Sequence, residues 1–421
     1  MKNKKHKPTT SSLSILRQIC NFIPPHLVPK LARETRVDEK ARTFSPWSHV
    51  VSLLYAQLTH SLGLNDVCDA LRLHSGPVST LRGAKPPCKN TLSHANRTRD
   101  PQMAERLFYS MLEHLQKLQP GFGGNRRPRF VFRFKRLIHV VDTTTIRLMA
   151  RSLDWAKHRR GKAAAKCHVR LNLQTFLPQC AIIESAAEHD SRRARELCAA
   201  VAPGEIVIFD KAYLDFAHLA DLSMREVFWV TRAKDDLRSR VARRLQEARV
   251  GNILRDDVIQ LRVWVSQKDY PECLRRVRAL VEVDGELREM SFLTNNFSWS
   301  AQTIADLYRC RWQIEIFFKE LKQTLQLADF LGHSAGAVKW QVWTALLAYL
   351  LLRFCAWLGQ WSHSFTRLFA LLRSALWQKL ELRSLLESCG TAAGGGRFLA
   401  QPQQAYLVGF NQELWDSQSL F

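Results

Sequence analysis

The sequence predicts an α/β fold in which a mixed β-sheet is flanked by helices. Two apolar runs typical of buried strands end at Asp142 and at Asp210. Other apolar runs with strand periodicity occur near them, and segments with the helical spacing of apolar residues lie between and around these runs. A helical segment late in the chain carries four polar side chains on one face. These observations predict both a sheet and a site at its edge.

The first part of the chain, residues 1–120, is predicted to be a helical N-terminal domain. Ser45 followed by Pro46 is a helix-start signal, because serine caps the helix and proline fits its first position. The expected helices are 13–22, 26–35, 46–62, 66–73 and 101–118. The basic stretch between the last two helices, residues 75–100, is expected to consist of turns.

Short helices followed by a segment rich in Lys, Arg, Asn and Thr resemble a helical reader of DNA ends. On this interpretation Lys89 and Arg97 contact DNA. The alternative is an ordinary helical bundle with solvated polar residues. The charge excess of the chain favours DNA contact, because that charge is neutralised by phosphates when DNA is bound.

Residues 121–136 form a predicted basic linker, in which six Arg and Lys residues alternate with aromatic ones. This pattern suits contact with phosphates combined with stacking on bases or sugars, and Arg127 and Arg129 are the candidate contacts. A simple solvated face is the alternative.

The region 137–234 is predicted to be the first part of a catalytic core. After the strand that ends at Asp142, strands are expected at 168–176 and 179–185, joined in a hairpin by Leu177-Pro178. Helices at 192–201 and 214–224, the strand that ends at Asp210 and a strand at 227–233 follow. The order β-β-β-α-β-α-β is that of a ribonuclease-H-like core, in which acids on neighbouring strands one and four converge.

The remaining chain is predicted to contain a β-rich insertion at 235–297, the rest of the core at 298–390 and a C-terminal tail at 391–421. Three alternating runs in the insertion, 258–267, 274–284 and 287–296, are typical of antiparallel strands. Apolar helices are expected at 337–358 and 365–386, where they would cover the sheet.

Four residues carry the most specific signal: Tyr308, Arg311, Glu315 and Lys322, at spacings of 3, 4 and 7. At about 100° per residue these steps return to one face of an α-helix, over roughly 21 Å. Apolar residues at neighbouring positions would pack on the sheet, so the polar face would look into a cleft. Taken alone, Arg311 and Glu315 would be a weak surface pair.

Asp142, Asp210 and Glu315 are therefore the candidate catalytic and metal-binding residues. Phosphodiester chemistry needs an activated oxygen, a stabilised leaving oxygen and neutralised phosphate charge. Two Mg²⁺ ions, or Mn²⁺ in their place, supply all three when carboxylates hold them. Asp142 would bridge the ions, and Asp210 and Glu315 would each complete one ligand shell. The alternative for each aspartate is a turn or helix-cap residue.

Composition points to the same partner. With 62 Lys and Arg against 38 Asp and Glu, the net charge is +24, which favours nucleic acid or an anionic membrane surface. The longest apolar stretch, near 345–352, is interrupted by Arg353 and is short for a membrane span. Ten cysteines without a CxxC pair and the lack of a signal peptide predict a reduced, cytoplasmic protein associated with the bacterial nucleoid.

The segment LYRCRWQIEIFFKELKQTL, residues 307–325, resembles the Y-(2)-R-(3)-E-(6)-K signature of DDE transposases in the fourth insertion-sequence family of bacteria. The blocks VVDTTTI, VIFDKAY, FWVTRAK and FLTNN are similar to that family in the same order. Upstream, FSPWSHVVSLLYAQL and TLSHANRTRD resemble its N-terminal DNA-binding domain. The resemblance covers about residues 10–390.

The resemblance implies a cut-and-paste transposase that binds terminal inverted repeats and target DNA, as a homodimer on paired ends. It implies that Tyr308, Arg311 and Lys322 hold the DNA end, and that Trp312 is a candidate to stack on a flipped base. Trp299 and Trp264 are alternatives for the stacking role. An inactive or repurposed transposase that only binds DNA, and a metal-dependent DNA nuclease, remain the competing interpretations; strand transfer separates the nuclease from a transposase.

Overall fold

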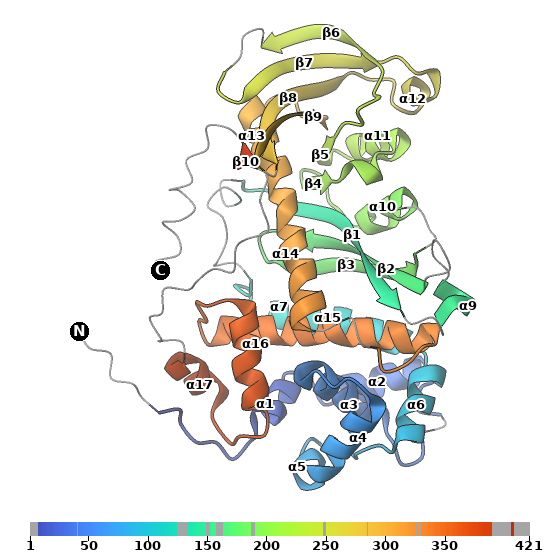
Figure 1. Ribbon diagram of the computed structural model, residues 1–421, viewed down its shortest axis with the longest axis vertical. Coiled ribbons are helices and arrows are strands. Elements are labelled where there is room, and N and C mark those ends of the chain that lie inside the picture. Colours follow the sequence, from blue (N-terminus) through green and yellow to red (C-terminus); the bar gives the residue numbers. More distant parts are fainter. Residues whose placement is uncertain are drawn as a thin grey trace, which may run out of the picture.

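A computed structural model shows an elongated molecule with a large sheet at one end and a layer of helices at the other (Figure 1). The structure describes residues 7–39, 41–123, 131, 134–148, 152–156, 163–186, 190–246, 250–283, 285–325, 327, 330–389 and 406–407. The mixed α/β architecture predicted from the sequence is confirmed.

One mixed sheet runs through the upper part of the molecule, with the strand order β3-β2-β1-β4-β5-β9-β8-β7-β6, and β10 pairs with β8. Strands β1, β4 and β5 are parallel to one another, whereas the other pairs are antiparallel. The strands are β1 Ile138–Leu148, β2 Ala163–Asn172, β3 Leu177–Ser185, β4 Ile206–Phe209, β5 Phe228–Arg232, β6 Ser239–Gln246, β7 Ile253–Leu261, β8 Leu274–Val283, β9 Glu286–Thr294 and β10 Tyr406–Leu407.

The helices form two groups, one against the sheet and one below it (Figure 1). Those associated with the sheet are α9 Leu153–Ala156, α10 Asp190–Cys198, α11 Phe216–Met224, α12 Trp264–Asp269, α13 Ala301–Arg309 and α14 Gln313–Lys319. Those of the helical layer are α1 Ile15–Asn21, α2 Leu27–Glu34, α3 Pro46–Thr59, α4 Leu64–Leu73, α5 Ser75–Ser79, α6 Lys89–Thr98, α7 Gln102–Leu118, α15 Ala335–Leu358, α16 Phe365–Ser374 and α17 Leu382–Cys389.

Alternation along the strands divides the sheet between two cores. Val141 and Val207 point to the face covered by α10 and α11, where Leu197 and Leu222 meet them. Val140 and its neighbours on the other face pack with α13 and α14. Because successive strand residues face opposite sides, one buried run such as IHVV supplies both cores.

Three predictions about strands were wrong. The hairpin turn lies at residues 173–176, and Leu177 with Pro178 begins β3. Strand β1 does not end at Asp142 but continues to Leu148, because Thr143–Ile146 are largely β-branched and pair with β2. The expected strand at 258–267 is replaced by the end of β7 and by α12. Strand β6 was not predicted, because its many arginines obscure the alternation of apolar and polar residues that is typical of a strand.

Two predictions about helices were also wrong. The stretch 75–100 contains α5 and α6 besides turns; in α6, Leu92, Ala95 and Asn96 are buried at helical spacing. The expected helix at 365–386 is two helices, α16 and α17, separated by residues 375–381. Apolar periodicity holds in both halves, so the sequence pattern alone does not reveal the break.

The helices at the two ends of the chain share one core, built around α15. This helix packs against α3, α6 and α7, which precede the sheet in sequence, and against α16 and α17, which follow it. By length and composition α15 could cross a membrane, but 78% of its most apolar 18-residue window is buried inside the protein. That burial is typical of a core helix.

Within this layer, His49 should make stability depend on pH. The ring is fully buried in α3, 2.8 Å from Asn96 Oδ1, and burial, followed by the charge of Arg99, lowers its pKa from 6.5 to about 3. The folded state keeps His49 neutral while the unfolded state takes up a proton, so its contribution is fully present above pH 6.5 and is lost as the pH falls towards 3.

Lowering the pH from about 7.5 to about 5.5 reduces the unfolding free energy of the wild type. We expect this reduction to be about 1.4 kcal/mol smaller in His49→Gln, because the variant has no buried imidazole that the unfolded state protonates. Urea unfolding at both pH values measures this difference. His94→Gln, on the exposed face of α6, is the control and should follow the wild type. An unchanged pH dependence in His49→Gln would show that another group controls acid stability.

Candidate active site

Strand pairing places Asp142 beside Asp210. The parallel pairing of β1 with β4 ends with Val141 opposite Phe209, so the next residue on each strand is an aspartate. Asp142 is held by the antiparallel partner β2, where it lies opposite Val169. Asp210 leaves the sheet and caps the short 3₁₀ helix η3, Lys211–Tyr213, by accepting from the amide of Ala212. Neighbouring strands therefore fix both acids.

The segment that carries Glu315 is helical but irregular. A 3₁₀ turn, η4 Cys310–Trp312, joins α13 to α14, and a π-helical turn, η5 Glu320–Thr324, follows α14. The prediction of one regular helix over this segment is therefore wrong. Tyr308, Arg311 and Glu315 nevertheless lie on the side that faces the two aspartates. Such 3₁₀ and π turns within a helix frequently mark functional segments.

Arg311 lies at the centre of the acidic residues. Its Nη1 is 2.9 Å from Asp142 Oδ2 and 3.3 Å from Glu315 Oε1, and its Nε is 3.9 Å from Asp210 Oδ1. The Arg311 side chain is only 12% exposed, whereas the Glu315 side chain is 43% exposed. The alternative of an isolated Arg311–Glu315 surface pair is therefore wrong, because Arg311 connects all three carboxylates.

Tyr308 completes the site on the side of Asp210. Its hydroxyl donates to Asp210 Oδ1 at 3.3 Å, and the centroid of its ring lies 4.8 Å from the ring centroid of Phe292 in β9. Burial, partly offset by Arg311, raises the pKa of Tyr308 to about 12. The phenol thus stays protonated and acts as a hydrogen-bond donor near the acids.

The environment of Asp142 disfavours its charge. Burial raises the pKa of Asp142 to about 7, against the opposing effects of Arg311 and of the Thr143 amide, which donates to Asp142 Oδ1 at 2.7 Å. Glu315 and Asp210 add repulsion in the same direction as burial. A site with several carboxylates therefore depends on a cation to stay ionised near neutral pH.

Lys322 lies further along, in the π-helical turn. In the described part of the chain it forms no hydrogen bond or ion pair, and burial lowers its pKa while Glu315 opposes that shift. Its ammonium group is thus electrostatically coupled to Glu315 without being bound by it. The structure brings Lys322 to the edge of the site and leaves it free to contact another anion.

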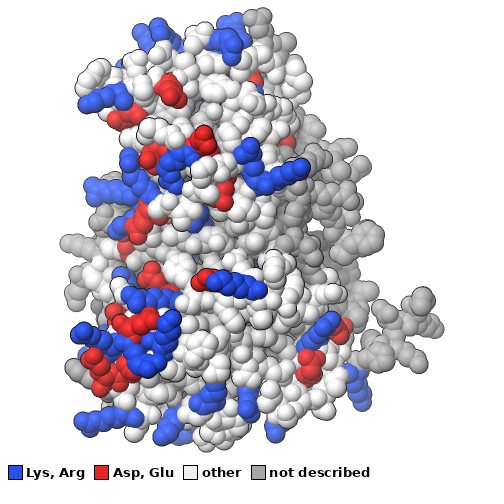
Figure 2. All heavy atoms as spheres, turned by 180° about the vertical axis from the view of Figure 1, so that it is seen from behind, with Lys and Arg blue, Asp and Glu red and all other residues white. Residues whose placement is uncertain are grey.

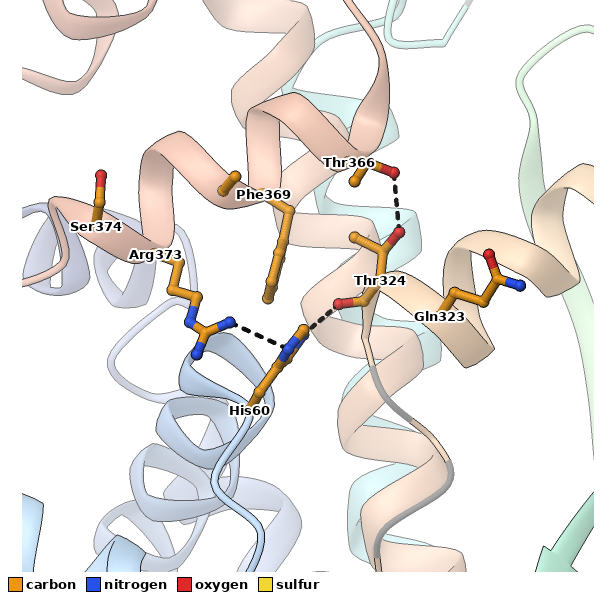
Figure 3. A pocket seen from close by; sticks show the side chains of 8 residues that line it. His60, Gln323, Thr324, Thr366, Phe369, Arg373 and Ser374 are labelled. Carbon is orange, nitrogen blue, oxygen red and sulfur yellow. Dashed lines mark hydrogen bonds between the residues drawn. The ribbon is translucent and has the colours of Figure 1, made fainter. Parts of the chain in front are cut away.

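The end of the π-helical turn η5 is hydrogen-bonded to residues on two neighbouring helices, α16 and the end of α3. Its last residue, Thr324, bonds through its hydroxyl to Thr366 of α16 at 3.2 Å, and its carbonyl accepts from the ring of His60, which follows α3 (Figure 3). Arg373 donates to the other ring nitrogen of His60 at 3.2 Å. These residues line a pocket of about 500 Å³. None of the three acids lines this pocket. The hydrogen bonds of Thr324 to Thr366 and His60 hold the end of the segment that carries Glu315.

A partly buried Arg353–Glu320 ion pair supports the same turn. Arg353 Nη2 is 2.5 Å from Glu320 Oε2, and its guanidinium packs on the rings of Phe176, Tyr349 and Phe365. The polar partners of η5 are therefore supplied by α15, α16 and the end of α3. Sequence reasoning did not find these supports, because they are distant in the chain.

A second polar chain that sequence reasoning missed lies under the aspartates. Tyr213, in the turn that Asp210 caps, hydrogen-bonds through its hydroxyl to His168 Nδ1 at 3.2 Å, and His168 Nε2 is 3.0 Å from Glu184. Arg193 of α10 completes the chain with a bond to Glu184 at 2.7 Å. The available signal was the tyrosine of the VIFDKAY block, three residues after Asp210.

The other predicted DNA contacts are dispersed. Lys89 and Arg97 lie exposed on α6, in the helical layer. Arg127 and Arg129 fall outside the residues that the structure describes. On the face drawn in Figure 2, Lys and Arg are spread along the height of the molecule, with Asp and Glu mostly beside them. That face thus shows no single basic patch.

The three candidate stacking tryptophans have different surroundings. Trp312 is partly exposed, and its ring lies 5.4 Å from the Arg311 guanidinium. Trp299 packs against Phe134 and Phe228, whereas Trp264 of α12 is 73% exposed. Only Trp312 is in contact with the acidic site among these described residues.

The three acids have the donor chemistry of a metal site. Carboxylate oxygens are the hard ligands that Mg²⁺ and Mn²⁺ prefer, and three of them face one cation, Arg311. Among the residues that the structure describes, no three His, Cys, Asp or Glu side chains form a group that could hold an ion. The three carboxylates therefore suit Mg²⁺ or Mn²⁺ as ligands, and the Arg311 guanidinium lies among them where a divalent ion would bind.

A family model described as "Transposase DDE domain" matches residues 133–351, just over half of the chain and the whole of the region that carries the three acids. The chain belongs to this family. A second model, "Domain of unknown function (DUF4372)", matches residues 11–78 in the helical layer.

Similar proteins carry transposase names. The chain is 29% identical over 232 residues to the "Probable transposase for insertion sequence element IS5377" of Geobacillus stearothermophilus, covering 54% of this chain and 59% of that protein. It is 29% identical over 255 residues to the "Putative transposase y4zB" of Sinorhizobium fredii, covering 60% of this chain and 70% of that protein. The match thus spans less than two thirds of the length of the first relative.

Among solved structures, the chain is similar to a piggyBac transposase in a synaptic complex with hairpin DNA. The TM-score is 0.45 at 9% sequence identity, and the alignment covers 99% of this chain and 87% of that chain.

Proposed function

We propose that this chain is a transposase that binds the inverted-repeat ends of an insertion sequence and cuts and rejoins DNA with the help of divalent metal ions. The observation that carries the proposal is the convergence of Asp142, Asp210 and Glu315 on one cation, although they come from two strands and a distant helix. Membership of the transposase DDE domain family supports it.

We also propose that β1–β5 with α10 and α11 form a ribonuclease-H-like core. Three antiparallel strands precede two parallel strands that add beside β1, in the order β3-β2-β1-β4-β5. This topology supports the proposal because it places the fifth residue of β1 next to the residue that follows β4. Strands β6–β9 would then be an insertion that extends the same sheet.

In the proposed reaction, Asp142 would hold both metal ions, Asp210 one of them and Glu315 the other. When bound, the ions supply an activated oxygen nucleophile, a stabilised leaving oxygen and neutralisation of phosphate charge. Tyr308 orients Asp210 through its hydroxyl, since the phenol donates to Oδ1. Arg311 and Lys322 are the cations available to position phosphates of the DNA end.

The proposed partners are double-stranded DNA at the element's ends and at the target, with two copies of the chain on paired ends. Trp312 is the proposed stacking residue for a displaced base, because it lies beside Arg311. Lys89 and Arg97 of α6, with Arg127 and Arg129 of the linker, are proposed to contact the flanking duplex. A cytoplasmic, nucleoid-associated location is expected for such a protein.

A strand-transfer assay tests the proposed function. The purified full-length chain is incubated with Mg²⁺, a DNA carrying the ends of the encoding element and a target plasmid. We expect cleavage at the element ends and joining of these ends to the plasmid. Cleavage without joining would identify a metal-dependent nuclease, and binding without cleavage would identify a DNA-binding protein only.

We further expect DNA binding to weaken steeply with salt. The chain carries a net charge of +24, and each phosphate that it neutralises adds roughly 0.9 to the slope of log affinity against log salt concentration. Fluorescence anisotropy across a series of salt concentrations should give a slope of at least about 3. A shallower slope would mean that the excess charge has a role other than phosphate contact.

A further inference from the structure

Arg311 is the shared partner of the proposed metal ligands. Ion-pair contacts connect its guanidinium to Asp142 at 2.9 Å, to Glu315 at 3.3 Å and to Asp210 at 3.9 Å. Among the residues that the structure describes, no other Lys or Arg forms an ion pair with these three carboxylates. One side chain thus forms ion-pair contacts with the whole set.

A guanidinium and a divalent ion compete for the same carboxylate oxygens. Mg²⁺ binds oxygen at about 2.0–2.1 Å in a compact shell, which leaves no room for N–H groups between the carboxylates. The positive charge of Arg311 also repels an approaching cation. In agreement with this competition, the three acids converge on Arg311, and no three His, Cys, Asp or Glu side chains among the described residues form a group that could hold a metal ion.

We infer that Arg311 is a resident cation that blocks divalent metal binding in the DNA-free protein and must leave the carboxylates before the ions bind. The inference rests on the proposed metal chemistry of this site. It assigns Arg311 two alternative partners, the acids in the free protein and a DNA phosphate in the complex. Its planar fork suits both, because carboxylate and phosphate oxygens have similar spacing.

The surroundings of Arg311 allow the exchange. The residue lies in η4, the 3₁₀ turn between α13 and α14, where the helix departs from regular geometry. Its Nε is buried without a hydrogen-bond partner, so the present position leaves one donor unused. Trp312 at 5.4 Å and Tyr308 at 6.0 Å present rings to the guanidinium, and cation–π contact can accompany its movement.

The consequence is a coupling between DNA and metal. A phosphate that attracts Arg311 exposes the carboxylates to divalent ions, and by linkage bound ions free Arg311 for DNA. Metal chemistry would then be assembled only where DNA is already bound. This arrangement would limit cleavage of DNA at random sites, because the DNA-free protein would not hold Mg²⁺ at the three acids.

Mn²⁺ titration of the DNA-free, full-length protein, followed by the electron paramagnetic resonance signal of free Mn²⁺, tests the inference. We expect Arg311→Gln to bind Mn²⁺ about tenfold or more tightly than the wild type, within the usual range of coupling between sites. Arg309→Gln is the matched control, since Arg309 lies two residues away and pairs with Asp306 at 3.6 Å; it should behave like the wild type. Adding Asp142→Asn to Arg311→Gln should abolish the gain.

Equal or weaker Mn²⁺ binding by Arg311→Gln, with Asp142→Asn still lowering the affinity, would overturn the inference and leave the proposed function intact. Mn²⁺ binding that does not depend on Asp142 in any variant, together with absence of DNA cleavage, would overturn both. Arg311→Lys provides a second measurement if Arg311→Gln does not fold. Arg311→Lys loses the planar fork that connects the three carboxylates, so its Mn²⁺ affinity should also exceed that of the wild type.

Discussion

Replacing Asp142 by alanine is expected to abolish DNA cleavage while leaving binding to DNA ends largely intact. Removing one metal ligand deletes charge stabilisation of the transition state, and a loss of about 4 kcal/mol corresponds to roughly a thousandfold in rate. The same result is expected for Asp210→Ala and Glu315→Ala. Binding should persist because a carboxylate contributes no attraction to phosphate. Nicking of supercoiled plasmid with Mg²⁺ and gel-shift titration measure the two properties.

The control for these variants is Asp215→Ala. Asp215 follows the same strand as Asp210 but caps α11, where its carboxylate accepts from the amide of His218 at 3.1 Å. Its replacement should cost about 1 kcal/mol of stability through the lost cap and leave cleavage near the wild-type rate. Nicking at the wild-type rate by Asp142→Ala, Asp210→Ala or Glu315→Ala would remove that residue from the catalytic site.

Arg311→Ala and Lys322→Ala are each expected to weaken complexes with DNA ends and to slow cleavage. Contacts between a charged side chain and phosphate position the scissile bond, and a misplacement of about 1 Å can cost on the order of 100-fold in rate. Arg311→Lys should be partly defective as well, because the charge remains while the planar fork is lost. Cleavage kinetics, end binding and melting temperature should be measured side by side.

The two cations should differ in their effect on folding. Arg311→Ala leaves Asp142 and its acidic neighbours without a shared counter-charge, so we expect its melting temperature to fall in metal-free buffer. Lys322→Ala should melt like the wild type, because Lys322 forms no ion pair within the described residues. Lys319→Ala, at an exposed position of the same segment, is the matched control. Full activity of Arg311→Ala would remove this arginine from the proposed DNA-binding set.

Much of the fold is encoded in local patterns. Apolar runs with strand periodicity predicted β1, β4 and β5, and helix-start signals such as Ser45-Pro46 predicted α3. The predictions of secondary structure failed where turn signals and helical apolar spacing occur in the same stretch. The 75–100 stretch contains Gly and Pro, yet apolar spacing is enough to form α6 once α4 and α15 cover its buried face. Local sequence does not contain the surface against which a helix packs.

The residue types and spacings of the site were also available from the sequence. Asp142 and Asp210 follow buried apolar residues, and Tyr308, Arg311 and Glu315 recur at helical spacing, because strands and helices impose fixed periods on the chain. Parallel pairing of neighbouring strands then makes it predictable that acids at equivalent positions lie close together. For this reason the sequence by itself determined which side chains could meet.

Only the tertiary structure decided how they meet. Arg311 could have been a surface partner of Glu315, but packing of α13 and α14 against β1 and β9 buries it and brings Asp142 within 2.9 Å. The supports of η5, from Arg353 and His60, lie on α15 and at the end of α3, far away in sequence. Contacts of this kind depend on how whole elements pack, since no local period relates residues that are 33 to 264 positions apart.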